Sequence, residues 1–376
     1  MIGNLQLLRG LAALGVVFYH TGYLLGNSVH TQFSGVSIFF VISGFIMVYV
    51  TRDSAKDFLK KRLVRICPLY AFLTLFSLIY FYGGFANLPA VVPIWGHLLA
   101  TNPIELINWF ANTYSAMITP KQIRAVITTL IFFPTAQPPV LGVGWTLNIE
   151  MYFYFVFWLC LLISKKLAPL LASTILVGVL VVAPIFDCGP ICNAYGHDYV
   201  KFFIFGFAIF YVWKIIAVLI QSSIIARAVL SLAAIAILLA WPFIEVLTDF
   251  PISEYSHHHY YLPPLVVLAF LTLHSAGLRI NNPGLLVFGA ASYALYLSHT
   301  LVIETIRTLA GVFDWLNFTR FPGLAIVLIV SVIVGLVIHV CVELPVLSAL
   351  TRLKFVRPTP RPPLVEPMLA DEAATR

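Results

Sequence analysis

Charged residues are scarce in this 376-residue chain, in which Asp, Glu, Lys and Arg together make up 10% of the residues. A soluble domain averages about 25% charged residues, with about half of its residues apolar. Here 61% of the residues are hydrophobic and 14% are aromatic, which excludes an ordinary soluble domain and predicts a polytopic membrane protein. The net charge of +7 does not indicate a nucleic-acid partner, because the basic residues fall between the hydrophobic runs or in the tail.

Cysteine is scarce too, with five residues in the chain. Cys67, Cys160 and Cys341 lie in or beside hydrophobic runs and are expected to be packing residues. Cys188 and Cys192 lie together in a polar loop, FDCGPICNAYGHD. Their spacing fits a disulfide and fits two free thiols equally well, so the sequence leaves both open.

Several familiar motifs are absent. The first hydrophobic run lacks the basic start and small-residue exit of a cleavable signal peptide, so we expect it to be retained as a membrane span. The chain has no G-x-S-x-G elbow, no P-loop and no H-E-x-x-H pair. The run His257–His259 has no Cys or acidic cluster of zinc spacing beside it, so no metal site is predicted.

The hydrophobic runs predict an all-α fold, because a membrane-spanning helix needs about 20 apolar residues. About ten transmembrane helices are expected, at residues 6–25, 35–51, 68–86, 144–163, 168–186, 199–213, 226–246, 260–276, 285–306 and 322–344. The proline-containing stretch 87–143 holds two amphipathic pieces, near 94–116 and 121–133, which are interpreted as interfacial or re-entrant helices. An eleventh span within the second piece would be too short to cross by itself.

The basic residues predict that both termini are cytoplasmic. With the N-terminus inside, five of the 22 Lys and Arg residues lie outside, namely Lys121, Arg124, Lys201, Arg307 and Arg320. Such an excess on the inner side is typical of membrane proteins. Residues 1–350 are interpreted as one membrane-embedded domain, and the Pro-rich residues 351–376 as a disordered cytoplasmic tail.

Arg9 and His20 lie inside the first hydrophobic segment, LQLLRGLAALGVVFYH. Their spacing is close to three helical turns, or ~16 Å, so both side chains face the same way. Ionisable groups inside a membrane are costly and are functional candidates by default. We therefore expect this helix to present a cation to an anionic donor near the surface, and an imidazole for acid–base chemistry at depth.

Arg62 and Arg65 share one helical face in KRLVRICPLY. Two guanidinium groups on one face suit a phosphate-rich ligand such as coenzyme A or a nucleotide. An ordinary basic loop that binds the headgroups of membrane lipid fits the spacing equally well. The small residues Ser37, Ser43 and Gly44 in GVSIFFVISGFIM are expected to serve helix packing.

Glu150 lies inside the apolar run of GVGWTLNIEMYFYFVFWL. A carboxylate there is either neutral or paired, and Arg9 and His20 are its candidate partners. The alternative is a hydrogen bond that only ties two helices together. In SYALYLSHTLVI, Tyr296 and His299 share a face with Ser292, and His299 is interpreted either as a second cavity histidine or as a hydrogen-bonded core residue.

Taken in order, these blocks resemble the membrane-bound acyltransferase family 3. The resemblance rests on Arg9 and His20 with ten residues between them, followed by GVSIFFVISGFIM, KRLVRICPLY, GWTLNIE, SYALYLSH and VELP. The family O-acylates sugars of lipopolysaccharide, exopolysaccharide and Nod factors, and the chain looks most similar to its short exopolysaccharide O-acetyltransferases. This implies an acetyl-coenzyme A donor from the cytoplasm, a carbohydrate acceptor and a place in the bacterial inner membrane.

The resemblance also implies roles for single residues. The residues expected to be catalytic are His20, Glu150 and Arg9. His20 is the acid–base group that takes the sugar proton or relays the acyl group, and Glu150 holds its imidazole. The residues expected to bind the donor are Arg9, Arg62, Arg65 and Trp145. The residues expected to bind the acceptor are Tyr152, Tyr293 and His299. One departure is Ser37, which stands where many members of the family have an acidic residue.

Two other functions use the same residues. A transporter or flippase for a glycan or lipid-linked sugar would employ the buried polar groups as a substrate path, although no internal repeat supports it. A non-catalytic subunit of a polysaccharide export system would tolerate substitution of Arg9, His20 and Glu150. The ordered motif blocks favour the enzyme over both. The last of these blocks contains Glu343, which is expected to pair with a basic loop residue.

Overall fold

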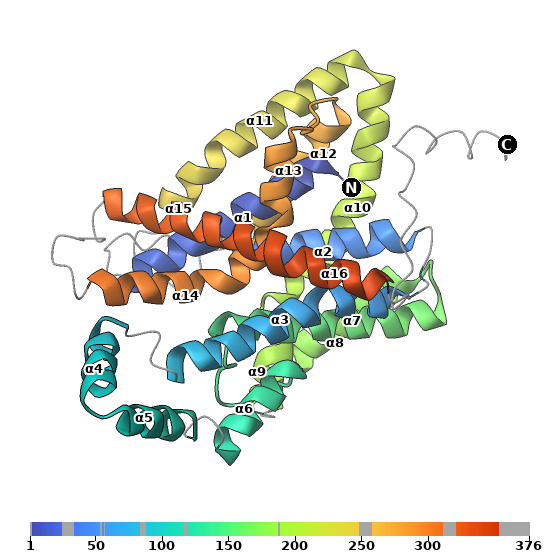
Figure 1. The fold of residues 1–376 in the computed structure, drawn as a ribbon. Coiled ribbons are helices and arrows are strands. Elements are labelled where there is room, and N and C mark those ends of the chain that lie inside the picture. The colour runs from blue at the N-terminus through green and yellow to red at the C-terminus, as the bar shows by residue number, and fades with distance from the viewer. Residues whose placement is uncertain are drawn as a thin grey trace.

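The computed structural model describes residues 2–24, 34–52, 55, 57–82, 88–115, 119–186, 189–247, 258–310 and 321–352. Every regular element within these ranges is a helix, which confirms the all-α fold. Figure 1 shows a bundle of long helices, with three shorter ones, α4 (Leu88–Thr101), α5 (Pro103–Ser115) and α6 (Pro120–Leu130), at one edge. Residues 353–376, nearly all of the predicted tail, lie outside the described ranges.

Two helices form the centre of the bundle. The first, α1 (Gly3–Leu24), contacts α2 (Gly35–Thr51) and four helices from the C-terminal half of the chain. These four are α12 (His258–Ser275), α13 (Pro283–Ala290), α14 (Ser292–Ala310) and α15 (Phe321–Ile338). Segments far apart in the sequence therefore meet around α1, where Arg9 and His20 lie.

The second central helix, α2, packs most extensively on α10 (Val200–Ser222). A Cβ atom on Gly44 would lie 2.2 Å from the main-chain oxygen of Phe203, and one on Gly206 would lie 2.3 Å from that of Val41. The two glycines thus let the backbones touch, as small residues do between membrane helices. This agrees with the packing role predicted for Gly44.

An aromatic core fixes α7 (Trp145–Ile163) against this pair. The rings of Phe153 and Phe203 are stacked with centroids 3.7 Å apart, and Phe157 lies 5.4 Å from Phe207. Phe153, Phe157 and Phe203 are fully buried, and stacked aromatic pairs stabilise beyond the area that they bury. The polar residues of α7 are thereby held in one place relative to α2.

Within the described ranges, five helical segments are long and apolar enough to cross a membrane, or six if α13 and α14 count as one bent span. They are Phe58–Phe81, Gly142–Ile163, Pro190–Ser222, Ile224–Ile244 and Gly323–Arg352. The remaining predicted runs also coincide with helices, but several of these are shorter, such as α2 and α8 (Ala168–Val182). The chain has the features of a membrane protein, and the count of ten spans stays a prediction.

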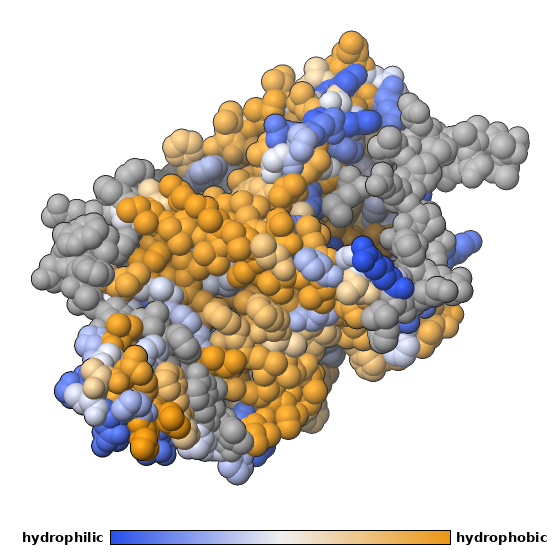
Figure 2. Space-filling model, in the orientation of Figure 1, coloured by the Kyte–Doolittle hydropathy of each residue, from blue (hydrophilic) through white to orange (hydrophobic). Residues whose placement is uncertain are grey.

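The surface agrees with a membrane environment. In Figure 2 hydrophobic residues cover most of the visible face over α15 and α3 (Phe58–Tyr82), while hydrophilic ones gather toward its edges. On α15 the side chains of Ile326, Ile329, Ile333 and Val337 are 45–58% exposed and recur every three or four residues. One face of this helix therefore presents a continuous apolar stripe outward, as lipid contact requires.

Two predicted elements are broken in the structure. From the sequence, the run 285–306 is expected to be one span. In the structure α13 ends at Ala290 and α14 begins at Ser292, with a bend of 61° between them. Gly289 in α13 lies directly against the main chain of Gln6, and both α13 and α14 pack on α1. The piece 94–116 divides at Asn102, because Pro103 suits the first position of a new helix and its amide is not needed there.

A third element is longer than predicted. The run 199–213 continues as α10 to Ser222, so Lys214 lies on a helix rather than in a connecting loop. After α10 the chain turns at Ser223 into α11 (Ile224–Leu247). At the other end of the chain, α15 passes through a π-helical turn, His339–Glu343, into α16 (Leu344–Arg352).

Candidate functional site

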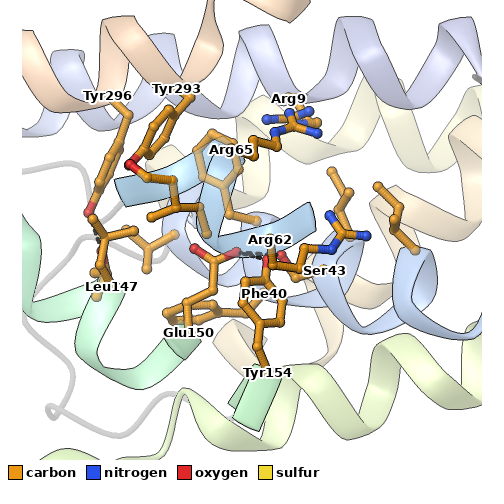
Figure 3. A pocket seen from close by; sticks show the side chains of 16 residues that line it. Arg9, Phe40, Ser43, Arg62, Arg65, Leu147, Glu150, Tyr154, Tyr293 and Tyr296 are labelled. Atoms are coloured by element: carbon orange, nitrogen blue, oxygen red, sulfur yellow. Dashed lines mark hydrogen bonds between the residues drawn. The ribbon is translucent and has the colours of Figure 1, made fainter. Parts of the chain in front are cut away.

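Side chains from five helices meet in one cavity of about 80 Å³, which has room for several water molecules. In Figure 3, Tyr293 and Tyr296 lie on one side of this cavity and Arg9 and Arg62 on the other. These polar lining residues are Arg9 of α1, Ser43 of α2, Arg62 and Arg65 of α3, Thr146, Glu150 and Tyr154 of α7, and Tyr293 and Tyr296 of α14.

Three arginines give the cavity its positive charge. None of the guanidinium groups of Arg9, Arg62 and Arg65 forms an ion pair with a carboxylate of the described residues. Arg62 lies over the rings of Phe58 and Tyr154, 5.8 and 5.6 Å from their centroids. Three cations and one carboxylate among the lining residues favour an anionic ligand, and the planar donor fork of Arg matches phosphate oxygens.

Glu150 is the carboxylate among the lining residues. Its Oε1 accepts hydrogen bonds from Ser43 Oγ, at 3.0 Å, and from Tyr154 Oη one turn along α7. Ser43, expected to serve packing alone, thus ties α2 to α7 through a polar contact. Tyr154, which the sequence reasoning did not single out, links Glu150 to the arginine cluster because Arg62 covers its ring.

His20 and His299 form a second polar group. His299 Nε2 lies 3.1 Å from His20 Nδ1, and the ring centroids are 4.9 Å apart. His20 Nδ1 also lies 3.0 Å from the main-chain oxygen of Val16, and His299 Nδ1 lies 2.6 Å from that of Tyr296. His299 is fully buried, whereas His20 is half-buried.

Tyr296 connects the cavity with the histidine pair. Its ring lines the cavity, and its Oη lies 2.8 Å from Thr146 Oγ1 of α7. Its main-chain oxygen is the acceptor for His299. Tyr293, one turn earlier on α14, donates from Oη to the main-chain oxygen of Ile66 in α3 at 2.9 Å. Arg62 and Arg65 belong to α3, and Arg9 and His20 lie about three helical turns apart on α1.

The geometry gives Glu150 and His20 different partners from those expected. Glu150 contacts Ser43 and Tyr154, and the partner of His20 is His299. The side chain of Glu150 faces the arginines, and His20 does not line that cavity. The hypothesis that Glu150 holds the imidazole thus has no direct contact between the two side chains behind it in the described part of the chain.

Two further candidates lie away from the cavity lining. Trp145, the first residue of α7, is 38% exposed, and its ring contacts those of His197 and Tyr199. Tyr152 stacks on Tyr195 with a centroid distance of 4.3 Å. The roles predicted for Trp145 and Tyr152 therefore stay predictions, without a contact to the arginines or to His20.

The π-helical turn holds a buried histidine–glutamate contact that the sequence reasoning missed. Glu343 Oε2 lies 2.6 Å from His339 Nδ1, and both side chains are less than 10% exposed. The expected partner, a basic loop residue, is thus replaced by a histidine one turn earlier. Glu343 and Arg65 both line a second, smaller cavity, so this pair borders the arginine cluster. The spacing of four residues was the available signal.

The cysteines of the described residues differ in their bonding state. Cys67, Cys160 and Cys341 are free, and Cys192 is disulfide-bonded. Cys188 lies outside the described residues. The side chains of the run His257–His259 also lie outside the described part of the chain.

A helical membrane protein with an arginine-lined cavity beside a histidine pair has the parts of an enzyme that binds an anionic substrate and moves protons. Comparison with known families makes this specific. A family model described as "Acyltransferase domain" matches residues 2–340, so the chain belongs to the acyltransferase 3 family. It is an acyltransferase, which favours the enzyme over the transporter and the assembly subunit.

Two curated relatives match most of the chain. "Exopolysaccharide production protein ExoZ" of Rhizobium meliloti (strain 1021) is 27% identical over 306 residues, 77% of this chain and 82% of the relative. "Nodulation protein 10" of Rhizobium leguminosarum bv. viciae is 26% identical over 344 residues, 83% of this chain and 86% of the relative. No solved structure matches the chain.

Proposed function

We propose that the protein is an integral membrane O-acyltransferase that moves an acetyl group from acetyl-coenzyme A to a sugar hydroxyl of an exported polysaccharide. The observation that carries this proposal is that Tyr296 links an arginine-lined cavity to a histidine pair, through its ring on one side and its main-chain oxygen on the other. Binding of a phosphate-rich donor and proton transfer are the two tasks of such an enzyme, and the two groups suit one task each.

Arg9, Arg62 and Arg65 hold the phosphates of the donor. Their guanidinium groups converge on one cavity without a carboxylate in ion-pair contact among the described residues, so their donors are available to phosphate oxygens. The donor supplies the acyl group as a thioester: the C–S bond breaks, a C–O bond to the sugar hydroxyl forms, and the hydroxyl proton ends on the thiol.

His20 holds that proton in transit. A histidine changes protonation near neutral pH and is the commonest general base in enzymes. His20 is half-buried, so an acceptor can reach its ring, whereas His299 behind it is fully buried. Tyr293 lines the cavity with the arginines and is proposed to border the acceptor.

A polysaccharide acceptor is supported by one of the relatives, whose name is "Exopolysaccharide production protein". The predicted inner-membrane location, with both termini cytoplasmic, places Arg9 toward the donor. Arg9 lies near the start of α1 and His20 near its end, so the acceptor hydroxyl would be met deeper in the membrane.

The test measures free thiol released from acetyl-coenzyme A by the purified full chain in nanodiscs. The acceptor is exopolysaccharide stripped of its O-esters by mild alkali. Release that requires both the polysaccharide and His20, and that is lost in His20→Ala, is the expected result. His97→Ala, an exposed histidine on α4, is the matched control and should keep the wild-type rate. Transfer at the wild-type rate by His20→Ala would overturn the proposal.

A further inference from the structure

The contacts of His299 determine which of its ring nitrogens carries a hydrogen. Its Nδ1 lies 2.6 Å from the main-chain oxygen of Tyr296, and a carbonyl oxygen only accepts. Nδ1 must therefore be the protonated nitrogen. In a neutral imidazole this leaves Nε2 with a free lone pair, so His299 Nε2 is an acceptor.

The same reasoning then applies to His20. Its Nδ1 faces two acceptors, the main-chain oxygen of Val16 at 3.0 Å and His299 Nε2 at 3.1 Å. Nδ1 must carry the hydrogen and share it between them. With both rings neutral, this is the one pair of tautomers that satisfies all three contacts, and it leaves the lone pair of His20 on Nε2.

Burial separates the two rings into different tasks. His299 is 0% exposed, so no substrate reaches it, and its two nitrogens are already engaged by Tyr296 and His20. His20 is half-buried, and its Nε2 is the nitrogen without a partner among the described residues. The buried ring of His299 thus contacts the accessible ring of His20 on the side away from its Nε2.

We propose that His299 is a positioning residue that fixes the tautomer and orientation of His20, the task that the sequence had suggested for Glu150. This rests on the proposed function. In the reaction the acceptor hydroxyl gives its proton to His20 Nε2, and His20 later passes that proton to the sulfur that leaves. While His20 is charged, its Nδ1–H stays bonded to His299 Nε2, which stabilises the cation without a carboxylate.

Three substitutions of His299 separate positioning from packing. Glutamine places an amide oxygen near the position of Nε2, so His299→Gln keeps an acceptor for His20. Asparagine is shorter, so His299→Asn retains a donor for the oxygen of Tyr296 but does not reach His20. His299→Leu fills the buried space without any polar contact. All three are assayed in nanodiscs with acetyl-coenzyme A and alkali-treated exopolysaccharide, after thermal unfolding has confirmed a folded protein.

The expected result is a lower kcat in His299→Asn and His299→Leu, and a kcat close to that of wild type in His299→Gln. A partner that orients a functional histidine contributes about 10- to 100-fold, so kcat should fall by that factor in His299→Asn and His299→Leu. The KM for acetyl-coenzyme A should stay within twofold, because His299 does not line the arginine cavity. His299→Gln should keep kcat within a few-fold of wild type.

A double variant isolates the coupling. If His299 acts through His20, then His299→Leu should cost nothing further in a His20→Ala background. A wild-type kcat in a folded His299→Leu variant would overturn the positioning role while leaving the acyltransferase intact. Equal losses in Gln, Asn and Leu would also overturn it and would assign His299 to packing. Activity of His20→Ala at the wild-type rate would instead refute the proposed function itself.

Discussion

Arg65 offers the sharpest test of the donor site, because its guanidinium group has no ion-pair partner among the described residues. A hydrogen bond to a charged group is worth about 1.5–3 kcal/mol. Each 1.4 kcal/mol corresponds to about a factor of ten in affinity. The change Arg65→Ala should therefore raise the KM for acetyl-coenzyme A by about 10- to 150-fold, with a smaller effect on kcat.

The same geometry predicts that stability does not suffer. Arg65 shares the cavity with Arg9 and Arg62, so its removal leaves no buried carboxylate unpaired and relieves like-charge repulsion. The midpoint of thermal unfolding should stay level or rise. Arg65→Lys, which keeps the charge but loses the planar fork, should fall between wild type and Arg65→Ala in KM.

The assay is thiol release at varied acetyl-coenzyme A, in nanodiscs of zwitterionic lipid and again with anionic lipid added. Arg124→Ala, an exposed arginine on α6, is the control and should leave KM unchanged. An unchanged KM in Arg65→Ala, or an effect that appears only with anionic lipid, would refute the phosphate site and support lipid headgroup binding instead.

Three further predictions follow from other contacts. Gly44→Val should lower the midpoint of thermal unfolding, because its Cβ would meet the main chain of Phe203 at 2.2 Å, while Gly178→Val, with nothing within 4 Å, should not. Glu150→Gln should lower the KM for acetyl-coenzyme A in a titration of donor, since it removes the carboxylate that competes with phosphate for the arginines; a raised KM would contradict this. His339→Leu leaves the buried Glu343 unpaired and should destabilise by about 3 kcal/mol in chemical unfolding, with His339→Gln milder.

The hydrophobic runs predicted most of the helices, because burial in lipid or protein demands long apolar segments whatever the tertiary fold. They did not predict the break at Ala291, since Ser292 and its neighbours are as compatible with a continuous helix as with a bend. That break depends on the close approach of Gly289 to Gln6, two residues far apart in the sequence.

Contacts within one helix were easier to foresee than contacts between helices. The period of a helix places Arg9 and His20 on one face, and in the structure both face α14. Arg9 lines the cavity with Tyr293 and Tyr296, and His20 contacts His299. The partner of His20 could not be chosen from the sequence, because Glu150 and His299 were both titratable groups in other runs. Only the packing of α1 against α14 selects between them.

The placement of Arg9 and His20 on a single helix has a consequence for donor selection. Their separation cannot change without unwinding α1, so the helix fixes a distance of ~16 Å along its axis between Arg9 at the anion site and the base His20. A donor must span that length to present its carbonyl carbon while its phosphates are held. A small acetyl donor such as acetyl phosphate could contact either Arg9 or His20 but not both. The fixed distance would therefore prevent short acetyl donors from reacting, without a separate gate.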